Sequence, residues 1–165
     1  MNQEKKVYIS LGSNLGDRLQ YLQNATHKIH DEVGPVLKIS SDYESRSWGF
    51  EGDDFLNRVI LVETHLTPQK VLKKLLEIEN FFGRVRTAET GYQSRPIDLD
   101  ILFYENKIIS HKYLKIPHPQ LHNRNFVLVP LCEIAPELVH PVFEKNITRL
   151  LEETPDNSEV QVYEK

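Results

Sequence analysis

The order of the hydrophobic patterns along this chain restricts its fold more than any other sequence feature. Four segments rich in apolar and β-branched residues have the character of strands, and two segments repeat apolar residues at helical spacing. Along the chain they are ordered strand, helix, strand, strand, helix, strand, which is the split βαβ pattern. This order predicts an α+β fold, with an antiparallel or mixed four-stranded sheet and both helices on one face. The segments are residues 7–11, 15–29, 36–43, 55–66, 67–82 and 95–104.

Residues of cap and turn type mark the limits of the two predicted helices. Asn14 or Asp17 is expected to cap the first helix. Thr67 followed by Pro68 is typical of the start of the second helix, and Gly83 ends it. The remaining elements are expected to be C-terminal additions, namely a short strand at 107–109 that pairs back on the last core strand, helices at 126–133 and 146–153, and a polar tail from residue 154 that is frayed or forms an edge strand.

Length and composition are those of one soluble domain. The 165 residues suit a single domain over 1–165 with one core. A hydrophobic content of 39% and a charged content of 27% are ordinary for a soluble globular protein. No apolar run approaches the roughly 18–20 residues of a membrane span, and the N-terminus has no signal-peptide core. Cys132 is the only cysteine and cannot form an internal disulfide, so we expect a cytoplasmic protein.

The charge distribution favours a small anionic ligand over a nucleic acid. The formal net charge is −4, which argues against an electrostatic nucleic-acid surface. The arginines are nevertheless clustered, because Arg84, Arg86 and Arg95 fall within twelve residues. Arg84 and Arg86 flank one valine, so in an extended segment both point the same way. Two guanidinium groups on one face match phosphate oxygens, although a pair of surface arginines gives the same pattern.

Two carboxylates occupy alternate positions in the last predicted core strand. Asp98 and Asp100 share one face of this strand, and Ile97, Leu99 and Ile101 face the core. Adjacent carboxylates repel each other and call for a positive partner. A hard divalent cation such as Mg²⁺ is the usual one, and an arginine fills the same role in a structural pair. The pattern alone also occurs on solvated strand faces.

The segment 117–126 adds a further cation and two imidazoles. His118 and Arg124 are suited to phosphate contact. A zinc site built on His118 and His122 is disfavoured, because Pro119 prevents a simple helical pair and no third soft ligand is evident.

Two further segments are open to more than one interpretation. Phe55 and Asn57 share a strand face, where an aromatic ring and a carboxamide can stack on a flat heterocycle and read its edge. Core packing with a turn asparagine is the alternative. The stretch 12–16 stands where a phosphate loop would be, but it has neither the Walker A pattern nor the G-x-G-x-x-G pattern, so we favour a tight turn with a helix cap.

Taken in order, these segments resemble the 6-hydroxymethyl-7,8-dihydropterin pyrophosphokinase family of folate biosynthesis. The resemblance runs from about residue 7 to about residue 141. Its most specific part is an R-x-[IL]-D-[IL]-D segment followed by P-H and N-R-x-F. The segments that carry it are 12–16, 55–57, 83–86, 95–100 and 117–126.

The resemblance implies a ferredoxin-like βαββαβ fold and a reaction. Pyrophosphate would pass from ATP to the hydroxymethyl group of the pterin, with release of AMP and with two Mg²⁺ ions. It implies catalytic roles for Arg84, Arg95, Asp98 and Asp100, the two aspartates being the metal ligands. It implies ATP contacts from Glu79, Arg84, Arg86, Arg95, Ile101, His118 and Arg124. It implies pterin contacts from Ser45, Trp48, Phe55, Asn57 and Phe126. We expect a monomer that binds ATP and the pterin, and neither nucleic acid nor membrane.

The chain departs from the family pattern in its loops. Tyr92 stands in a loop that often carries tryptophan, Arg46 and Ser47 replace a proline-containing approach to Trp48, and Thr87 replaces a frequent lysine. Two other classes of function are compatible with parts of the sequence. One is a single-stranded RNA-binding module with this fold, against which the acidic charge and the missing RNP-type motif count. The other is a metal-dependent nucleotidyltransferase.

Overall fold

One antiparallel sheet organises the molecule. The computed structural model describes residues 3–164, apart from 46–53, 84, 87–92 and 95. Within these residues, six strands form a sheet in the order β10-β3-β4-β1-β7, with β2 also paired to β4, and every neighbouring pair is antiparallel. The strands are β1 (Lys5–Ser13), β2 (Val36–Ile39), β3 (Tyr43–Ser45), β4 (Phe55–Thr64), β7 (Asp98–Tyr104) and β10 (Val160–Val162).

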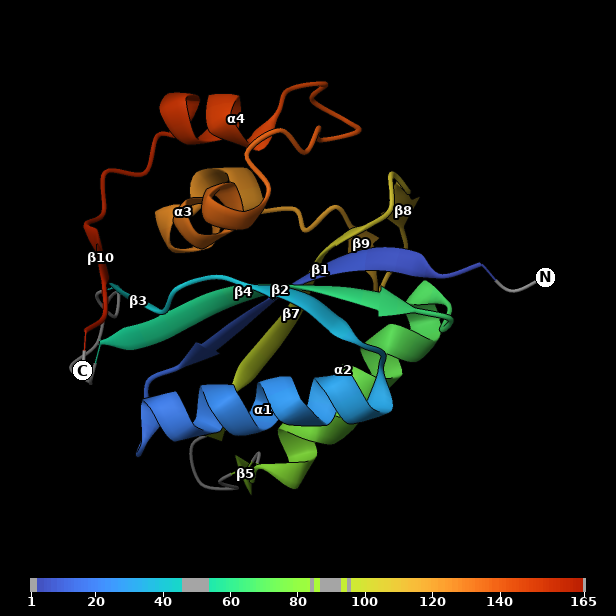
Figure 1. The fold of residues 1–165 in the computed structure, drawn as a ribbon, viewed down its shortest axis with the longest axis vertical. Coiled ribbons are helices and arrows are strands. Elements are labelled where there is room, and N and C mark those ends of the chain that lie inside the picture. The colour runs from blue at the N-terminus through green and yellow to red at the C-terminus, as the bar shows by residue number, and fades with distance from the viewer. Residues whose placement is uncertain (1–2, 46–53, 84, 87–92, 95, 165) are drawn as a thin grey trace.

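The two predicted core helices lie together on one face of the sheet, as Figure 1 shows. α1 (Arg18–Glu32) begins after Asp17, and the side chain of Asp17 caps it. α2 (Pro68–Phe81) begins after Thr67, which is its cap. The core elements follow one another as β1, α1, the β2–β3 segment, β4, α2 and β7. This order confirms the predicted α+β, ferredoxin-like core.

The C-terminal part of the chain covers the opposite face (Figure 1). α3 (Asn125–Ile134) packs on the sheet, and α4 (Ile147–Glu153) lies over α3, so both predicted additional helices are present. The polar tail contains β10 at the edge of the sheet, so it forms an edge strand, which is one of the two forms predicted for it. Among the described helices, none has the length and hydrophobicity needed to cross a membrane.

Three strand predictions need correction. The single strand predicted over 36–43 is divided into β2 and β3, because the Ser40 hydroxyl takes a ladder position by accepting from the backbone N of Val59 at 2.9 Å. β1 extends through Gly12 and Ser13, where a turn was predicted, since both residues still pair with β4. The segment after β7 does not pair back on it. Instead β8 (Ile109–Ser110) pairs with β9 (Lys115–Ile116).

Shorter elements complete the fold. The predicted polar loop before β7 contains the paired strands β5 (Val85–Arg86) and β6 (Gln93–Ser94). A 3-10 turn, η1 (Leu121–Asn123), leads into α3.

Separate hydrophobic clusters fill the two faces of the sheet. Ile97, Leu99 and Ile101 are buried in the cluster beneath α1 and α2, as predicted. A β-bulge between β1 and β7 then places both Leu102 and Phe103 in the cluster beneath α3. The Asp98 and Asp100 side chains share this second face, but they lie where α3 no longer covers it. The sheet therefore changes from a packed core to an open polar surface along one strand.

A buried histidine in the second cluster makes stability depend on pH. The His140 side chain is 3% exposed, stacks on Phe143 and meets the Phe103 ring edge-on. Desolvation, with a smaller contribution from His122, lowers its pKa to about 4. An unfolded chain protonates this imidazole near its ordinary pKa of 6.5. The unfolded state therefore gains protons first, and the folded state loses stability as the pH falls from 6.5 towards 4.

We expect the free energy of unfolding to fall by about 1–2 kcal/mol more in the wild type than in His140→Asn between about pH 7.5 and about pH 5. Asparagine keeps an acceptor for the backbone N of Val142 and Phe143, which His140 Nδ1 binds at 3.1 and 3.2 Å. Urea denaturation at both pH values measures the difference, and contributions from other histidines cancel between the two proteins. Equal pH dependence in both proteins would show that His140 does not control it.

Candidate active site

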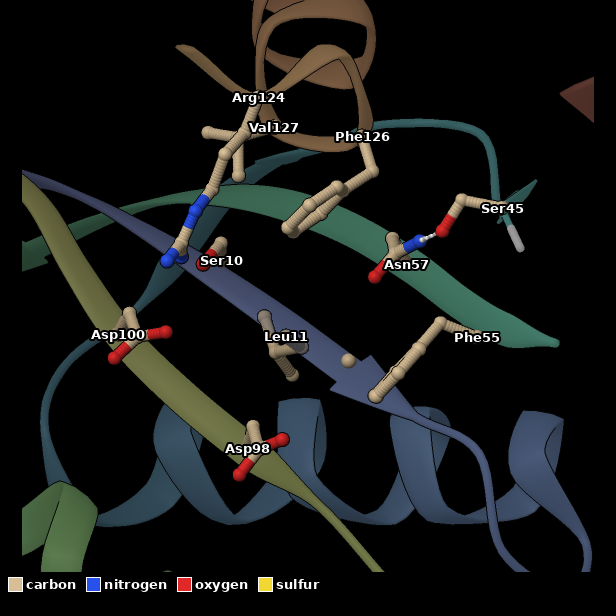
Figure 2. A pocket seen from close by; sticks show the side chains of 11 residues that line it. Ser10, Leu11, Ser45, Phe55, Asn57, Asp98, Asp100, Arg124, Phe126 and Val127 are labelled. Atoms are coloured by element: carbon tan, nitrogen blue, oxygen red, sulfur yellow. Dashed lines mark hydrogen bonds between the residues drawn. The ribbon is translucent and has the colours of Figure 1, made fainter. Parts of the chain in front are cut away.

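A cavity of about 380 Å³ lies on the open part of the second sheet face. Its floor consists of β1, β4 and β7, and its roof is the beginning of α3 (Figure 2). It brings together residues that are more than eighty positions apart in the sequence. The predicted site residues that line it are Ser45, Phe55, Asn57, Asp98, Asp100, Arg124 and Phe126.

Small residues in the central strand make room for this cavity. Ser10 and Gly12 of β1 lie opposite Asp100 and Asp98 of β7, respectively. On its other side Gly12 lies opposite Asn57, and a Cβ at Gly12 would come within 3.1 Å of Asn57 Oδ1. Both residues line the cavity, and neither was predicted as a site residue. The sequence could have indicated them only through their spacing, because two residues that stand two positions apart in a strand share one face.

The two aspartates lie on the cavity side of β7, as Figure 2 shows. Asp100 is exposed and Asp98 is half-buried. The residue between them, Leu99, is held from the other face, because its backbone N donates to the buried carboxylate of Glu79 at 2.8 Å. Glu79 was predicted to contact ATP, and in this structure it fixes the strand that carries the aspartates.

The cavity end nearest β3 is suited to a flat polar ligand. Asn57 Nδ2 donates to Ser45 Oγ at 2.8 Å, and both side chains are buried. This hydrogen bond fixes the carboxamide, so that its oxygen faces the cavity. The rings of Phe55, from β4, and Phe126, from α3, extend into the cavity from its two sides, with Asn57 between them (Figure 2). The two rings offer stacking faces for such a ligand, and the oriented amide can form hydrogen bonds with the ligand's polar edge.

A cation, Arg124, lies at the opposite end of the cavity. Arg124 extends from the start of α3 towards Asp100 and Ser10 (Figure 2). His118 is close enough to both charged groups for its titration to respond to them. Burial lowers the pKa of His118, Asp100 raises it, and Arg124 lowers it further, with a net shift below the ordinary value. Since Nδ1 accepts from the backbone N of Gln120 at 3.1 Å, the neutral ring carries its proton on Nε2 and can donate there.

A second cavity of about 320 Å³ adjoins the acidic strand. Asp100, Ile101 and His118 line it, together with residues 112–115 and part of α2. Asp100 therefore borders both cavities. The Ile101 side chain is itself buried in the first cluster, so Ile101 contributes only a small part of this wall.

Several predicted site residues cannot be placed. Trp48, Arg84 and Arg95 lie outside the described residues, as does Tyr92. Arg86 belongs to β5, but its side chain is outside the described part. In the part of the chain that the structure describes, no group of three or more His, Cys, Asp or Glu side chains could hold a metal ion by itself.

Fold and site together define an α+β domain in which paired carboxylates stand beside a pocket lined by two aromatic rings and a carboxamide. The family model described as 7,8-dihydro-6-hydroxymethylpterin-pyrophosphokinase (HPPK) matches residues 8–136. The chain belongs to this family of pyrophosphokinases, and the resemblance seen in the sequence is confirmed.

Individual relatives agree with this assignment. The chain is 43% identical to 2-amino-4-hydroxy-6-hydroxymethyldihydropteridine pyrophosphokinase of Aquifex aeolicus, over 92% of each chain. It is 41% identical to the protein of the same name from Haemophilus influenzae, over 94% of this chain and 97% of the relative.

A solved structure agrees in fold. A triple mutant of Plasmodium falciparum HPPK-DHPS superimposes with a TM-score of 0.75 at 18% identity. The match covers 92% of this chain and 42% of that one, so the present chain spans less than half of the longer protein.

Proposed function

We propose that this chain transfers pyrophosphate from ATP to the hydroxymethyl group of 6-hydroxymethyl-7,8-dihydropterin and releases AMP, as a step of folate synthesis. One observation carries the proposal beyond family membership. Asp100 borders both the cavity with the aromatic rings and the cavity next to His118. A pterin in the first and a nucleotide in the second would meet at the acidic strand.

The pterin would occupy the end of the cavity near β3. Phe55 and Phe126 would stack on its two faces, and Asn57 would bind its polar edge. Ser45 would hold the Asn57 amide in the orientation that presents its oxygen. The hydroxymethyl group would then point along β1 towards Asp98 and Asp100. We also assign Trp48 to this site, from the resemblance.

The triphosphate would lie over the acidic strand, with Arg124 and the Nε2–H of His118 as donors to its oxygens. Arg84, Arg86 and Arg95 are assigned to the same phosphates from the resemblance, and Glu79 and Ile101 would border the nucleotide. Asp98 and Asp100 would hold two Mg²⁺ ions. The donor set fits this metal, because Mg²⁺ is commonly bound by one or two carboxylates with waters and substrate phosphates completing its coordination. Bound Mg²⁺ would neutralise charge on the triphosphate oxygens.

Positioning and charge neutralisation would carry most of the chemistry. Among the described residues that line the first cavity, the titratable side chains are Asp98, Asp100 and Arg124. An aspartate that holds Mg²⁺ would not be free to take the proton of the alcohol, so this set offers no separate general base. Phosphoryl-type transfer depends mainly on alignment and electrostatic stabilisation, which suits such a set. Arg124 would stabilise the charge that passes to the leaving AMP.

A product assay tests the reaction directly. The protein is incubated with Mg²⁺, ATP and 6-hydroxymethyl-7,8-dihydropterin, and the nucleotide products are separated. We expect AMP and pterin pyrophosphate in equal amounts, with no AMP when the pterin is omitted. Release of pyrophosphate with a nucleotide attached to the pterin would identify a nucleotidyltransferase, and ADP would identify an ordinary kinase. No turnover together with salt-sensitive retention of single-stranded RNA would favour the RNA-binding alternative.

A further inference from the structure

The C-terminal segment 154–163 lies beyond the residues that the family model matches, yet it contacts two walls of the candidate site. β10 pairs with β3, where Val160 lies opposite Ser45. Further upstream, Asp156 bonds to Asn125 at the beginning of α3. Figure 1 shows this segment running down from α4 to the edge of the sheet.

Asp156 supplies the cap that α3 lacks in its own sequence. The residue at the N-cap position, Arg124, makes no capping hydrogen bond with its side chain. Instead, Asp156 Oδ2 accepts from the backbone N of Asn125 at 2.8 Å. Asn125 Nδ2 donates in return to the carbonyl oxygens of Asp156, at 2.8 Å, and Ser158, at 3.1 Å. The tail and the first residue of α3 are thus joined by three hydrogen bonds.

The second oxygen of the same carboxylate orders the tail. Asp156 Oδ1 accepts from the backbone N of Ser158 at 2.8 Å and from the Ser158 hydroxyl. Desolvation raises the pKa of Asp156, but the hydrogen bonds from Ser158 and Asn125 outweigh it and hold the pKa below its ordinary value. A carboxylate is also favourable beside the positive end of a helix dipole.

Hydrogen bonds, and not close packing, form this link. A cavity of about 630 Å³ separates residues 155–158 from Arg124 and Phe126. Since the tail does not fill this space, the bonds at Asn125 are its direct hold on the first turn of α3, whose inner side is packed through Val127 and Leu128. Asn125 stands between Arg124, the N-cap residue of α3, and Phe126 in its first turn, and both of these neighbours line the first cavity.

The far end of the tail supports the other wall. The backbone N of Tyr163 donates to the carbonyl oxygen of Asp42 at 2.8 Å. The Arg18 guanidinium lies over the Tyr163 ring, pairs with Glu44 at 2.8 Å and donates to the carbonyl oxygen of Asp54 at 2.7 Å. Glu44 and Asp54 directly precede Ser45 and Phe55. The tail therefore connects the α3 side of the pterin pocket to its β3 and β4 side.

We infer that Asp156 is a positioning residue for the pterin pocket, which acts through Asn125 on Phe126 and Arg124. This inference rests on the proposed function for the identity of the ligand. Loss of the carboxylate releases the first turn of α3, so that the Phe126 ring is no longer held in the cavity opposite Phe55 before the pterin binds. The free-energy cost of ordering that turn then weakens pterin binding.

The test compares Asp156→Ala, Asp156→Asn and a matched control, Glu153→Ala. Glu153 is also a carboxylate of the C-terminal region, but its partners are the exposed Lys145 and Arg149. Calorimetric titration with 6-hydroxymethyl-7,8-dihydropterin in the presence of a non-hydrolysable ATP analogue gives the pterin Kd. We expect Asp156→Ala to raise this Kd about three- to thirtyfold, the range of a lost helix cap. Asp156→Asn should lie between Asp156→Ala and the wild type because it keeps one acceptor, and Glu153→Ala should match the wild type.

Hydrogen exchange of residues 121–130 provides a readout that needs no ligand. We expect faster exchange in Asp156→Ala and unchanged exchange in Glu153→Ala. Unchanged exchange and an unchanged pterin Kd in a folded Asp156→Ala protein would overturn the inference, whatever its melting temperature. If Asp156→Ala does not fold, the same comparison is decisive for Asp156→Asn. A wild-type protein that fails to bind the pterin contradicts the proposed function, whereas the exchange comparison still decides whether Asp156 orders α3.

Discussion

Replacement of Asp100 by asparagine is expected to reduce turnover at least about a hundredfold, and Asp98→Asn should have a similar effect. Both carboxylates face the cavity from one strand, and asparagine preserves their size while removing the charge that would hold Mg²⁺. The fold should persist, because the core contacts of β7 come from its apolar residues, such as Leu99 and Ile101 on the opposite face, and not from the aspartates. Initial rates over a Mg²⁺ titration, with a thermal melt of each variant, measure both effects.

Glu77→Gln on α2 is the matched control for the loss of one negative charge. Glu77 is exposed, pairs with Lys74 and lines neither site cavity. We expect normal turnover in this control and, for Asp100→Asn, a rate that recovers in part at high Mg²⁺. The metal affinity of each variant can be followed separately by Mn²⁺ binding in the presence of ATP. Near-normal turnover of a well-folded Asp100→Asn protein at low Mg²⁺ would contradict the assignment of this carboxylate.

The sequence predicted the parts of this structure that depend on local periodicity. Alternation alone places Asp98 and Asp100 on one face of β7 and Leu99 on the other, and the structure confirms this arrangement. The α+β class and the shared face of α1 and α2 likewise follow from the order and spacing of apolar residues. Helix caps such as Asp17 and Thr67 are local as well, because each accepts a hydrogen bond from a residue three positions later.

The parts that were predicted incorrectly, or not predicted at all, depend on partners that are distant in the sequence. Gly12 has low strand propensity, which favours a turn, but pairing with both Asn57 and Asp98 keeps it in β1. The bulge that turns Leu102 and Phe103 to the same face arises from the register of β7 against β1, which one strand cannot reveal.

The site shows the same division. The role of Asn57 was suggested by its strand face and by the family resemblance, and that of Phe126 by the resemblance alone. The hydrogen bond between Asn57 and Ser45 could not be seen in either segment alone. The Asp156 cap was missed for a related reason. A helix cap is normally sought beside the helix, and here it comes from a residue that lies 31 positions after Asn125. Only the closed tertiary structure brings such groups together.

Phe126→Ala is expected to weaken pterin binding about ten- to a hundredfold, because a stacked ring contributes about 1–3 kcal/mol. Nucleotide affinity measured without the pterin should change little. Asn57→Ala should act in the same direction, since the polar edge of the pterin and the Ser45 hydroxyl would both lose a partner. Calorimetric titration of each variant with each ligand, beside a thermal melt, gives the comparison.

A matched phenylalanine separates stacking from general loss of packing. Phe81 lies on α2, is 67% exposed and lines neither site cavity, so Phe81→Ala should leave both affinities unchanged. Phe126 is half-buried against the second hydrophobic cluster, and a purely structural role would appear as a lower melting temperature with parallel losses for both ligands. If Phe126→Ala melts early but binds the pterin normally, Phe126 is a core residue, and the pterin does not lie between the two rings.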